Sequence, residues 1–586
     1  MLRESGILRK SNQVLFDSRN ILYKKPFGAV STKEEVTFLF PVDDALNVQN
    51  VKLFLRRNDY IQNFELDNIG WEIGYSLFSL KLTINNPGTY YYRFELYTND
   101  RIIYCGQDGK GVALLGEFLP EWQLSVYESG YKTSKFIKGG VVYQIFVDRF
   151  NNVDNKVTPK YGVMKNWNED VTTVDPDGVY RANDFYGGNF KGIEEKIPYL
   201  KSLGVTCLYL SPIFLSHSNH RYDTGDYLKL DPMLGTEDDF KRLVSKCKKN
   251  GISIVLDGVF NHTGADSIYF NKFNHFKSLG AYQSKESKYY DWYTFSEYPD
   301  EYTCWWGITV VPTVSRSALS YRKFICNDVI KKWSSFGIKG WRLDVVDELS
   351  TEFVDMIREA IKKYDSDALV LGEVWEDAST KYSYDEERQY FFGKELDGVM
   401  NYVYKDAMID YVLNGNPIKF IDAIYDIMEN YPKQSLNTCF TLVDSHDTIR
   451  IINYLSEVDV SEMNKEEKKH RFLTFNEYVK ARERVLFISC IQFFLPGVPT
   501  IYYGDEVGIQ GYEDPLNRRP FPWGKEDEQI LAHYRKLGQL RKKYKKEFIE
   551  YPYIYLENEN TIVFKRDKIS LKVNQTNLKY EIIEEE

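Results

Sequence analysis

The hydrophobic pattern changes character near residue 136. Before that point, short β-branched and aromatic runs such as residues 36–42 and 89–99 are separated by turn-forming stretches such as Asn-Asn-Pro-Gly. Several short strands at regular spacing are typical of a two-sheet architecture. The pattern therefore predicts a β-sandwich over residues 1–135.

From residue 136 onward, apolar strand-like runs alternate with amphipathic helical stretches. Such alternation predicts βαβ units and a parallel sheet. Eight units fit a closed (β/α)8 TIM barrel over residues 136–535. The connection after the third strand, about residues 262–320, is long and rich in aromatic residues, and such insertions usually form a lid or a cleft wall. A few strand-like runs then predict a short C-terminal β-module over residues 536–586.

Carboxylates stand at the ends of five of these apolar runs. They are Asp257, Asp344, Glu373, Asp447 and Glu506. The carboxyl ends of parallel barrel strands meet at one face, where barrel enzymes carry their catalytic groups. The spacing therefore predicts a cluster of acids at the mouth of the barrel.

Three acids at one mouth suit glycoside hydrolysis, which needs one ionised carboxylate and one that holds a proton. Glu373 follows the apolar run Ala-Leu-Val-Leu-Gly, and an apolar setting raises a carboxyl pKa, so it is the better candidate acid. Asp344 lies two residues after Arg342, on the same face of an extended strand. A guanidinium there would keep Asp344 ionised, as a nucleophile requires. Asp447 directly follows His446, and such a pair can grip neighbouring sugar hydroxyls.

A structural interpretation competes at each position, because a lone Asp at a strand end is often a helix cap or an ion-pair partner. Asp505 and Glu506 fit either a site or a cap, and His220 fits either interpretation. The five acids at successive strand ends, with His262, His446 and Arg342 beside them, favour the catalytic interpretation.

Composition excludes several other classes of function. The formal net charge is -10 and no basic run forms a nucleic-acid footprint. No run approaches the length of about 18 apolar residues that a membrane span needs, and the N-terminus lacks the apolar region of a secretory signal. The seven cysteines are scattered, which predicts a reducing compartment and a cytoplasmic location. The 46 tyrosines and 10 tryptophans fit either a sheet-rich core or a groove that stacks on sugars.

Four segments resemble, in order, the signature regions of the α-amylase family of retaining glycoside hydrolases. They are residues 257–262, 340–348, 372–378 and 444–448, and residues 205–214 and 219–227 resemble the second-strand region of that family. The likeness extends from about residue 140 to residue 530. It implies that Asp344 is the nucleophile, Glu373 the acid/base and Asp447 the transition-state stabiliser. It also implies that Arg342 orients the nucleophile, that Tyr222, His262 and His446 hold the sugar at the cleavage point, and that Asp257 braces the site.

Further features resemble the neopullulanase, cyclomaltodextrinase and maltogenic amylase branch. The N-terminal sandwich is similar to the starch-binding-type module of that branch, and Asp347 with Glu348 resembles its sequence after the nucleophile. Residues 512–523 also look like that branch, which implies that Asp514 and Arg518 help to hold the glucose before the cut. Residues 310–315 depart from its usual insertion motif. The branch also implies a homodimer formed through the N-terminal module.

The calcium loop of that branch is only partly matched. Asn152, Asp154 and Gly187 fit, but Asn189 replaces an acid, and Val157 and Thr158 occupy ligand-like positions. Calcium prefers several charged oxygens. We therefore expect that no cofactor is required and that any calcium site here is weak.

The sequence thus predicts a retaining hydrolase of α-1,4-glucosidic bonds in pullulan, cyclodextrins, maltooligosaccharides or starch. Flat rings would stack on the sugars, and the candidates are Tyr222, Trp305, Trp306 and Trp375. An α-glucosidase or glucan transferase on the same site is one alternative. A non-catalytic glucan-binding protein is another, which the presence of all three carboxylates disfavours. The mechanism requires Asp344 and Glu373 to face each other across about 5–5.5 Å.

Overall fold

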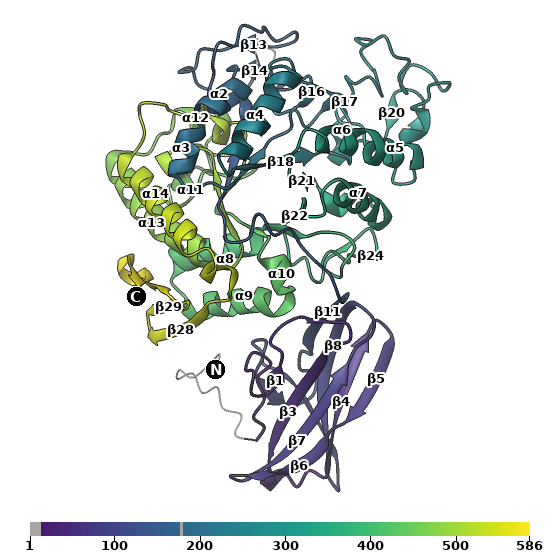
Figure 1. Ribbon diagram of the computed structural model, residues 1–586, viewed down its shortest axis with the longest axis vertical. Helices are drawn as coiled ribbons and strands as arrows, with labels where there is room; N and C mark the ends of the chain where they lie inside the picture. The colour runs from purple at the N-terminus through teal and green to yellow at the C-terminus, as the bar shows by residue number, and fades with distance from the viewer. Residues whose placement is uncertain (1–12, 176–177, 179, 586) are drawn as a thin grey trace.

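The computed structural model describes residues 13–175, 178 and 180–585. Figure 1 shows two lobes, with a helix-surrounded barrel above and an elongated all-β module below. The strand-rich N-terminal module confirms the predicted sandwich. One sheet has the order β1 (Lys24–Lys25), β3 (Glu35–Asp43), β7 (Tyr75–Thr83) and β6 (Asp67–Glu72). The other contains β10 (Ala113–Leu115), β9 (Ile102–Gln107), β8 (Gly88–Tyr97), β11 (Trp122–Tyr127) and β2 (Val30–Ser31), with β4 (Asn50–Arg57) and β5 (Tyr60–Glu65) beside β8.

Aromatic rings fill the space between the two sheets. Phe40 of β3 stacks on Phe94 of β8 with ring centroids 4.2 Å apart, and Tyr92 stacks on Trp122 at 5.4 Å. All four side chains are buried. The inward-facing positions of both sheets thus form a core of their own, as in other sandwiches.

Eight parallel strands close into the predicted barrel. In order they are β12 (Val142–Ile145), β15 (Cys207–Leu210), β18 (Ser253–Gly258), β21 (Gly340–Leu343), β22 (Leu369–Val374), β25 (Gly398–Asn401), β26 (Phe440–Thr441) and β27 (Val498–Tyr502). Pairing of Val142 with Thr500 closes the ring. Each strand lies on a run predicted from the sequence, so their carboxyl ends meet at a single mouth.

Two of the helical stretches around the barrel are broken into shorter helices. The barrel helices are α2 (Phe190–Glu195), α3 (Ile197–Ser202), α4 (Glu237–Lys249), α5 (Leu319–Phe324), α6 (Ile330–Ser334), α7 (Thr351–Tyr364), α8 (Tyr402–Asn414), α9 (Pro417–Asn430), α13 (Phe475–Phe494) and α14 (Glu528–Lys543). The chain breaks between α2 and α3 because Pro198, in the first turn of α3, lacks the N–H that a continuous helix needs. A π-helical turn over Ile325–Val329 separates α5 from α6.

The insertion after β18 has little regular structure and folds back onto the end of that strand. It contains η2 (Tyr290–Trp292), β19 (Phe295–Glu297), β20 (Glu301–Tyr302) and η3 (Trp305–Gly307). The N–H of Val314 donates to the carbonyl of Asn261 at 2.9 Å, and the N–H of Thr263 donates to that of Pro312 at 3.1 Å. These bonds hold the insertion beside the mouth of the barrel.

The C-terminal module is one antiparallel sheet of β28 (Tyr553–Asn558), β29 (Thr561–Lys565), β30 (Ile569–Asn574) and β31 (Lys579–Glu584). The predicted boundary at residue 535 falls inside α14, which packs on α13. Across the part of the chain that the structure describes, no helix combines the length and apolar character needed to span a membrane.

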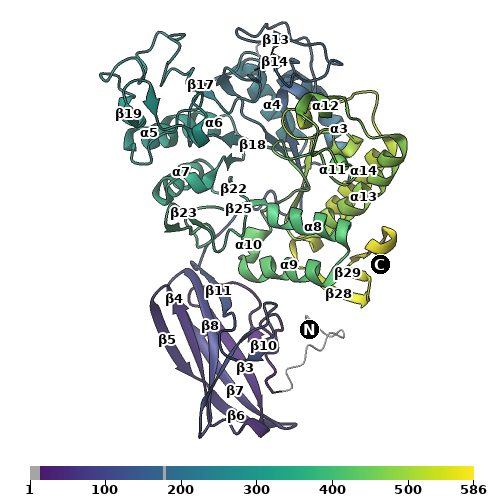
Figure 2. The same cartoon turned by 180° about the vertical axis from the view of Figure 1, so that it is seen from behind.

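The N-terminal module docks on α9, which lies directly above it in Figure 2. Arg19 is buried there, with its guanidinium nitrogens 3.2 Å from carboxylate oxygens of Asp422 and of Glu429. Asp426 completes the acidic side of this contact, and Lys110 lies 3.1 Å from Asp422. A buried, hydrogen-bonded ion cluster of this kind specifies how the two surfaces meet.

Candidate active site

Three of the predicted carboxylates meet around one buried guanidinium at the mouth of the barrel. Arg342 and Asp257 are register partners on β21 and β18. Nη1 of Arg342 donates to Asp257 Oδ1 at 2.9 Å and to Asp344 Oδ1 at 2.6 Å. Nη2 lies 2.9 Å from Glu373 Oε2. Because Nη1 and Nη2 are neighbours on one planar group, Asp344 and Glu373 lie side by side and share one environment.

The turn after Asp344 strengthens this pairing. The N–H of Val345 donates to Glu373 Oε2 at 2.9 Å. Val345 has a φ of 37°, in the left-handed region that a β-branched residue rarely adopts. Such strain persists only where the surroundings hold it in place. The backbone here is thus bent so that an N–H group meets the carboxylate of Glu373.

Electrostatics at this cluster favour a bound proton. Burial raises the pKa of Asp344 well above its usual value, and repulsion from Glu373 and Asp257 acts in the same direction, while Arg342 opposes it. The sequence predicted that Arg342 would hold Asp344 ionised. The ion pair forms, but burial of the carboxylate outweighs it. Burial likewise raises the pKa of Asp257, and Arg342 opposes that rise too.

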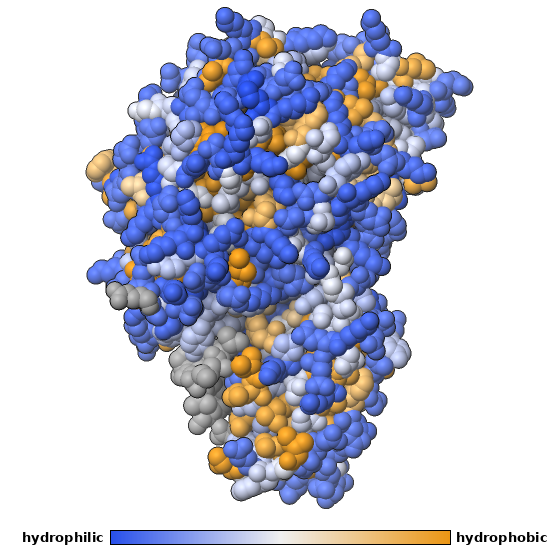
Figure 3. All heavy atoms as spheres, viewed as in Figure 1, coloured by the Kyte–Doolittle hydropathy of each residue, from blue (hydrophilic) through white to orange (hydrophobic). Residues whose placement is uncertain are grey.

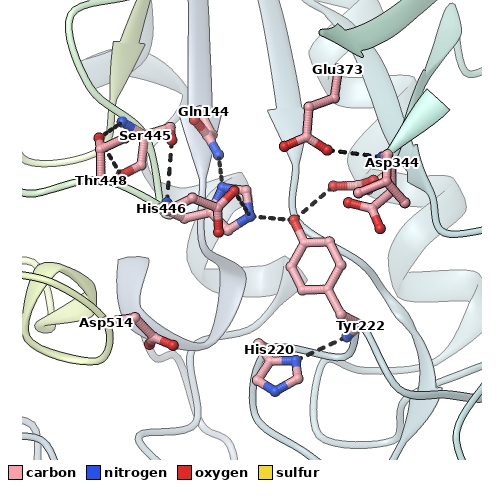
Figure 4. Close-up of polar contacts among 12 residues, drawn as sticks. Gln144, His220, Tyr222, Asp344, Glu373, Ser445, His446, Thr448 and Asp514 are labelled. Carbon is pink, nitrogen blue, oxygen red and sulfur yellow. Dashed lines mark hydrogen bonds and ion pairs between the residues drawn. The ribbon is translucent and has the colours of Figure 1, made fainter. Parts of the chain in front are cut away.

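A second set of residues forms the opposite side of the site, where Figure 4 places Tyr222 and His446 facing each other. Tyr222 Oη donates to Asp257 Oδ2 at 3.0 Å and lies 2.5 Å from His446 Nε2. Gln144 Nε2 donates to His446 Nδ1 at 2.9 Å, so the ring proton is on Nε2. Burial lowers the pKa of His446 well below its usual value, with Arg518 and Arg342 adding to the effect. His446 is therefore a neutral donor.

Asp447 is held from two directions. His446 Nε2 lies 3.2 Å from its Oδ2, and Arg518 Nη2 lies 3.5 Å from its Oδ1. Arg518 Nη1 also contacts Asp514 at 2.8 Å, and Figure 4 shows Asp514 and Glu373 on opposite sides of Tyr222. Burial raises the pKa of Asp447, while Arg518 opposes that rise. The structure thus brings Asp447, Asp514 and Arg518 together as one linked group.

Aromatic side chains border the acids. Trp375 Nε1 donates to Glu373 Oε1 at 3.2 Å, and its ring stacks on Tyr402 with centroids 3.9 Å apart. The Trp375 side chain is 43% exposed, so part of its ring faces open space. From the insertion, Trp305 stacks on His262 at 5.4 Å. Burial lowers the pKa of His262 to about 4, which keeps its imidazole neutral near pH 7.

The three positions that the sequence left open have partners outside the cluster around Arg342. Glu506 accepts hydrogen bonds from Tyr143 Oη at 2.6 Å and from Tyr199 Oη at 2.7 Å. Neither tyrosine belongs to the cluster around Arg342, so Glu506 does not join the other four acids. Asp505 pairs with the buried Arg450 at 2.9 Å. His220 lies behind Tyr222, with its Nδ1 accepting from the Tyr222 N–H at 3.1 Å.

Sequence reasoning missed three residues of the site. Gln144, Tyr209 and Tyr402 were not identified, although Tyr209 Oη donates to Asp257 at 2.5 Å. Gln144 and Tyr209 occupy partner positions in the register of β12 and β15. Side chains alternate between the two faces of a strand, so the residue two positions before Asp257 and its partners on the neighbouring strands share one face. That alternation in the sequence points to Tyr209 and Gln144.

The candidate calcium loop does not fit a cation. Asn155 Nδ2 donates to the carbonyls of Gly187 at 2.9 Å and Met233 at 2.7 Å. Asn189 Nδ2 donates to the carbonyl of Val153 at 2.8 Å, while its Oδ1 caps α2 by accepting from the N–H of Gly192. Amide donors therefore take the carbonyl oxygens that a cation would need. Among the described residues, no three His, Cys, Asp or Glu side chains gather in a metal-binding group.

Comparisons with known proteins agree with this geometry. Residues 144–532 match the family described as "Alpha amylase, catalytic domain". An amylopullulanase of Thermoanaerobacterium saccharolyticum is 32% identical over 584 residues, which cover 90% of this chain and 44% of the relative. A cyclomaltodextrinase of Thermoanaerobacter pseudethanolicus is 31% identical, with 88% of this chain and 86% of the relative covered.

Among solved structures, the type III pullulan hydrolase from Thermococcus kodakarensis is similar with a TM-score of 0.66 and 25% identity. The match covers 96% of this chain and 94% of that protein. The chain spans less than half the length of the amylopullulanase, so only the shared portion of that relative is comparable.

Proposed function

Because the chain belongs to the α-amylase family of glycoside hydrolases, we propose that it cleaves α-1,4-glucosidic bonds with retention of configuration. Asp344 acts as the nucleophile, Glu373 as the acid/base and Asp447 as the transition-state stabiliser. One observation carries the proposal: Asp344 and Glu373 bind adjacent nitrogens of Arg342. Retaining enzymes need their two carboxyl groups about 5–5.5 Å apart, whereas inverting enzymes leave room for a water molecule between them.

The first displacement joins substrate to enzyme. An Asp344 oxygen bonds to the anomeric carbon while the bond from that carbon to the leaving oxygen breaks, and Glu373 gives its proton to that oxygen. In the second displacement, ionised Glu373 takes a proton from water, whose oxygen bonds to the same carbon and releases Asp344.

The opposite side of the site binds the sugar whose anomeric carbon reacts. Neutral His446 and Tyr222 offer hydrogen bonds without a charge that would compete with Asp344. Asp447, held by Arg518, accepts from sugar hydroxyls and strengthens those bonds as positive charge develops on the ring. Trp375 offers a flat, half-exposed face for stacking on the leaving sugar.

The substrates we propose are pullulan, cyclodextrins, maltooligosaccharides and starch, on the strength of the names of the similar proteins. The test is separate incubation with β-cyclodextrin, pullulan and soluble starch, followed by product sizing. We expect ring opening of β-cyclodextrin and short products from all three. Asp344→Asn should lower these rates by about 10⁴-fold or more, as loss of a catalytic nucleophile does in other enzymes.

Other outcomes identify the alternatives. Release of glucose alone, with β-cyclodextrin left closed, would indicate an α-glucosidase acting from chain ends. Products longer than the substrate would indicate a glucan transferase. Binding of β-cyclodextrin without turnover would indicate a non-catalytic binding protein and contradict the proposal.

We propose that activity needs no metal, because Asn155 and Asn189 already satisfy the carbonyls of the loop. Treatment with EDTA should leave the rate unchanged. We also propose a reducing, cytoplasmic setting, because all seven cysteines are free.

A homodimer through the N-terminal module is a further part of the proposal. Figure 3 shows apolar surface on the lower lobe, and Ile69, Trp71 and Ile73 of this module are exposed. Large exposed apolar side chains close together favour association. Sedimentation velocity should give twice the monomer mass for the wild type and a smaller mass for Trp71→Ser.

A further inference from the structure

One segment connects the N-terminal module to the turn that follows Asp344. Residues 376–392, here called the acceptor wall, leave the end of β22 after Glu373 and carry the small hairpin of β23 (Tyr382–Ser383) and β24 (Glu386–Glu387). Both ribbon views place this hairpin directly above the barrel-facing end of the module, near β11 (Figures 1 and 2).

The acceptor wall is tied to Asp347, three residues after the nucleophile. Lys381 Nζ lies 3.1 Å from Asp347 Oδ2, and Tyr390 Oη donates to Asp347 Oδ1 at 2.5 Å. Ser383 Oγ donates to the Asp347 carbonyl at 2.5 Å. Both carboxylate oxygens of Asp347 are therefore engaged by the wall, which makes this residue an anchor.

The next residue anchors the insertion in the same way. Glu348 Oε1 accepts from the indole N–H of Trp305 at 3.0 Å and of Trp306 at 3.3 Å. Its Oε2 accepts from Asn261 Nδ2 at 2.8 Å. Consecutive acids after the nucleophile thus hold two different walls of the site, one on each side.

The far end of the acceptor wall is fixed by the N-terminal module. Thr89 Oγ1 of β8 donates to the Ser379 carbonyl at 2.9 Å, and Gln123 Nε2 of β11 donates to Ser379 Oγ at 2.9 Å. The N–H of Glu128 donates to the Phe392 carbonyl at 2.9 Å. Thr89 and Ser379 are both buried, so water cannot replace these bonds at low cost.

The position of the wall follows from the chemistry. A general acid must touch the leaving oxygen, so the chain that continues from Glu373 lies on the side of the leaving sugar. Figure 4 agrees, since Asp514 lies across Tyr222 from Glu373, and Arg518 contacts Asp514. A sugar that accepts the glycosyl group in place of water enters on this same side, because the second displacement reverses the first.

We propose that the N-terminal module, through Thr89 and Gln123, positions the acceptor wall and thereby raises transfer to a sugar over transfer to water. This inference rests on the proposed function. In the transfer step, a hydroxyl oxygen of the acceptor bonds to the anomeric carbon, the bond from that carbon to Asp344 breaks, and Glu373 takes the hydroxyl proton. A sugar needs a fixed wall to orient its hydroxyl, whereas water does not.

The test uses α-maltosyl fluoride as donor and added glucose as acceptor, with the full-length protein. Fluoride leaves without occupying the acceptor side, so only the second step depends on the wall. Thr89→Val combined with Gln123→Leu should lower the ratio of transfer to hydrolysis by about fivefold, the effect of about one hydrogen bond. The hydrolysis rate without glucose should stay within about twofold of the wild type, because water needs no such orientation.

Two matched controls separate the contact from the substitution. Thr89→Ser keeps the hydroxyl and should show the wild-type ratio of transfer to hydrolysis. Gln49→Leu removes a glutamine of the same module whose amide donates to the nearby Asn47 carbonyl, and it should change nothing. If the double variant misfolds, Lys381→Met breaks the other end of the wall and should lower the ratio in the same way.

Each remaining outcome has one meaning. An unchanged ratio in a folded double variant overturns the inference, and so does a wild type that hydrolyses the fluoride without any transfer to glucose. A fall in thermal stability with an unchanged ratio would assign Thr89 and Gln123 a structural role only. If the wild type does not cleave the fluoride, or if Asp344→Asn cleaves it at full rate, the proposed function itself fails.

Discussion

At the scale of single residues, Arg342 organises the reacting groups. One buried guanidinium contacts Asp257, Asp344 and Glu373. Burial raises the pKa of Asp344 and of Asp257, and Arg342 opposes both rises. The same contacts fix the direction of each carboxylate, because a planar guanidinium offers its N–H groups in a fixed fork.

The pH profile tests this role of Arg342. Burial raises the pKa of Asp344 and Arg342 opposes the rise. Replacing Arg342 by Met removes the opposing charge, so Asp344 should keep its proton to a still higher pH. The acid limb of the pH profile of kcat/KM should then move to higher pH. Arg342→Lys keeps the charge and should leave the limb near its wild-type pH. A limb that stays in place or moves downward in Arg342→Met would contradict this account.

At the scale of elements, buried polar contacts fix how strands meet helices. Glu506, just after β27, accepts from Tyr143 of β12 and Tyr199 of α3. Burial raises the pKa of Glu506 to about 7. The carboxyl group therefore holds its proton in the fold at pH values where the unfolded chain has lost it.

Stability should follow that difference in proton binding. The pKa of Glu506 is higher in the folded chain than in the unfolded chain. Its contribution to the free energy of unfolding is therefore complete below about pH 4.5 and is lost as the pH rises toward 7. Glu506→Gln stays neutral throughout. As the pH rises from about 4.5 to 7, the thermal midpoint of the wild type should fall relative to that of Glu506→Gln. The fall corresponds to about 3 kcal/mol in the free energy of unfolding. The exposed Glu559→Gln is the control, and equal pH profiles for wild type and Glu506→Gln would refute the assignment.

Strand and helix periodicity predicted the barrel and the sandwich correctly, and four of the five strand-end acids, all but Glu506, lie together in the site. The same reasoning could not separate Glu506 from Asp257, because both follow apolar strands. Gly504, with a φ of 94°, starts a turn that sends Glu506 away from the mouth, and apolar periodicity does not encode that turn. Contacts such as Thr89 with Ser379 join residues 290 positions apart. Only the packed fold brings such pairs together.

At the scale of the whole molecule, the N-terminal module is held on the catalytic lobe by contacts that include two polar anchors. Arg19 anchors it on α9 among Asp422, Asp426 and Glu429, and Thr89 with Gln123 contacts the acceptor wall. Two separate anchors fix an orientation that one alone would leave free to rotate.

Removing the first anchor should loosen the lobes. Arg19→Met leaves three carboxylates without their guanidinium, and breaking a buried ion cluster costs about 3–5 kcal/mol. We expect a larger radius of gyration by small-angle scattering and faster proteolysis between the lobes. Arg101→Met, at an exposed position of the same module, should behave as the wild type. Unchanged scattering from Arg19→Met would show that other contacts suffice.

Trapping the covalent intermediate tests the retaining mechanism at the reacting atom itself. Glu373→Gln should react with α-maltosyl fluoride, whose departure needs no acid, but should turn over slowly because no base activates water. Peptide mass spectrometry should then find a maltosyl group on the carboxylate of Asp344. A group attached to any other residue, or fluoride release with no attached sugar and with β-configured product, would contradict the retaining mechanism.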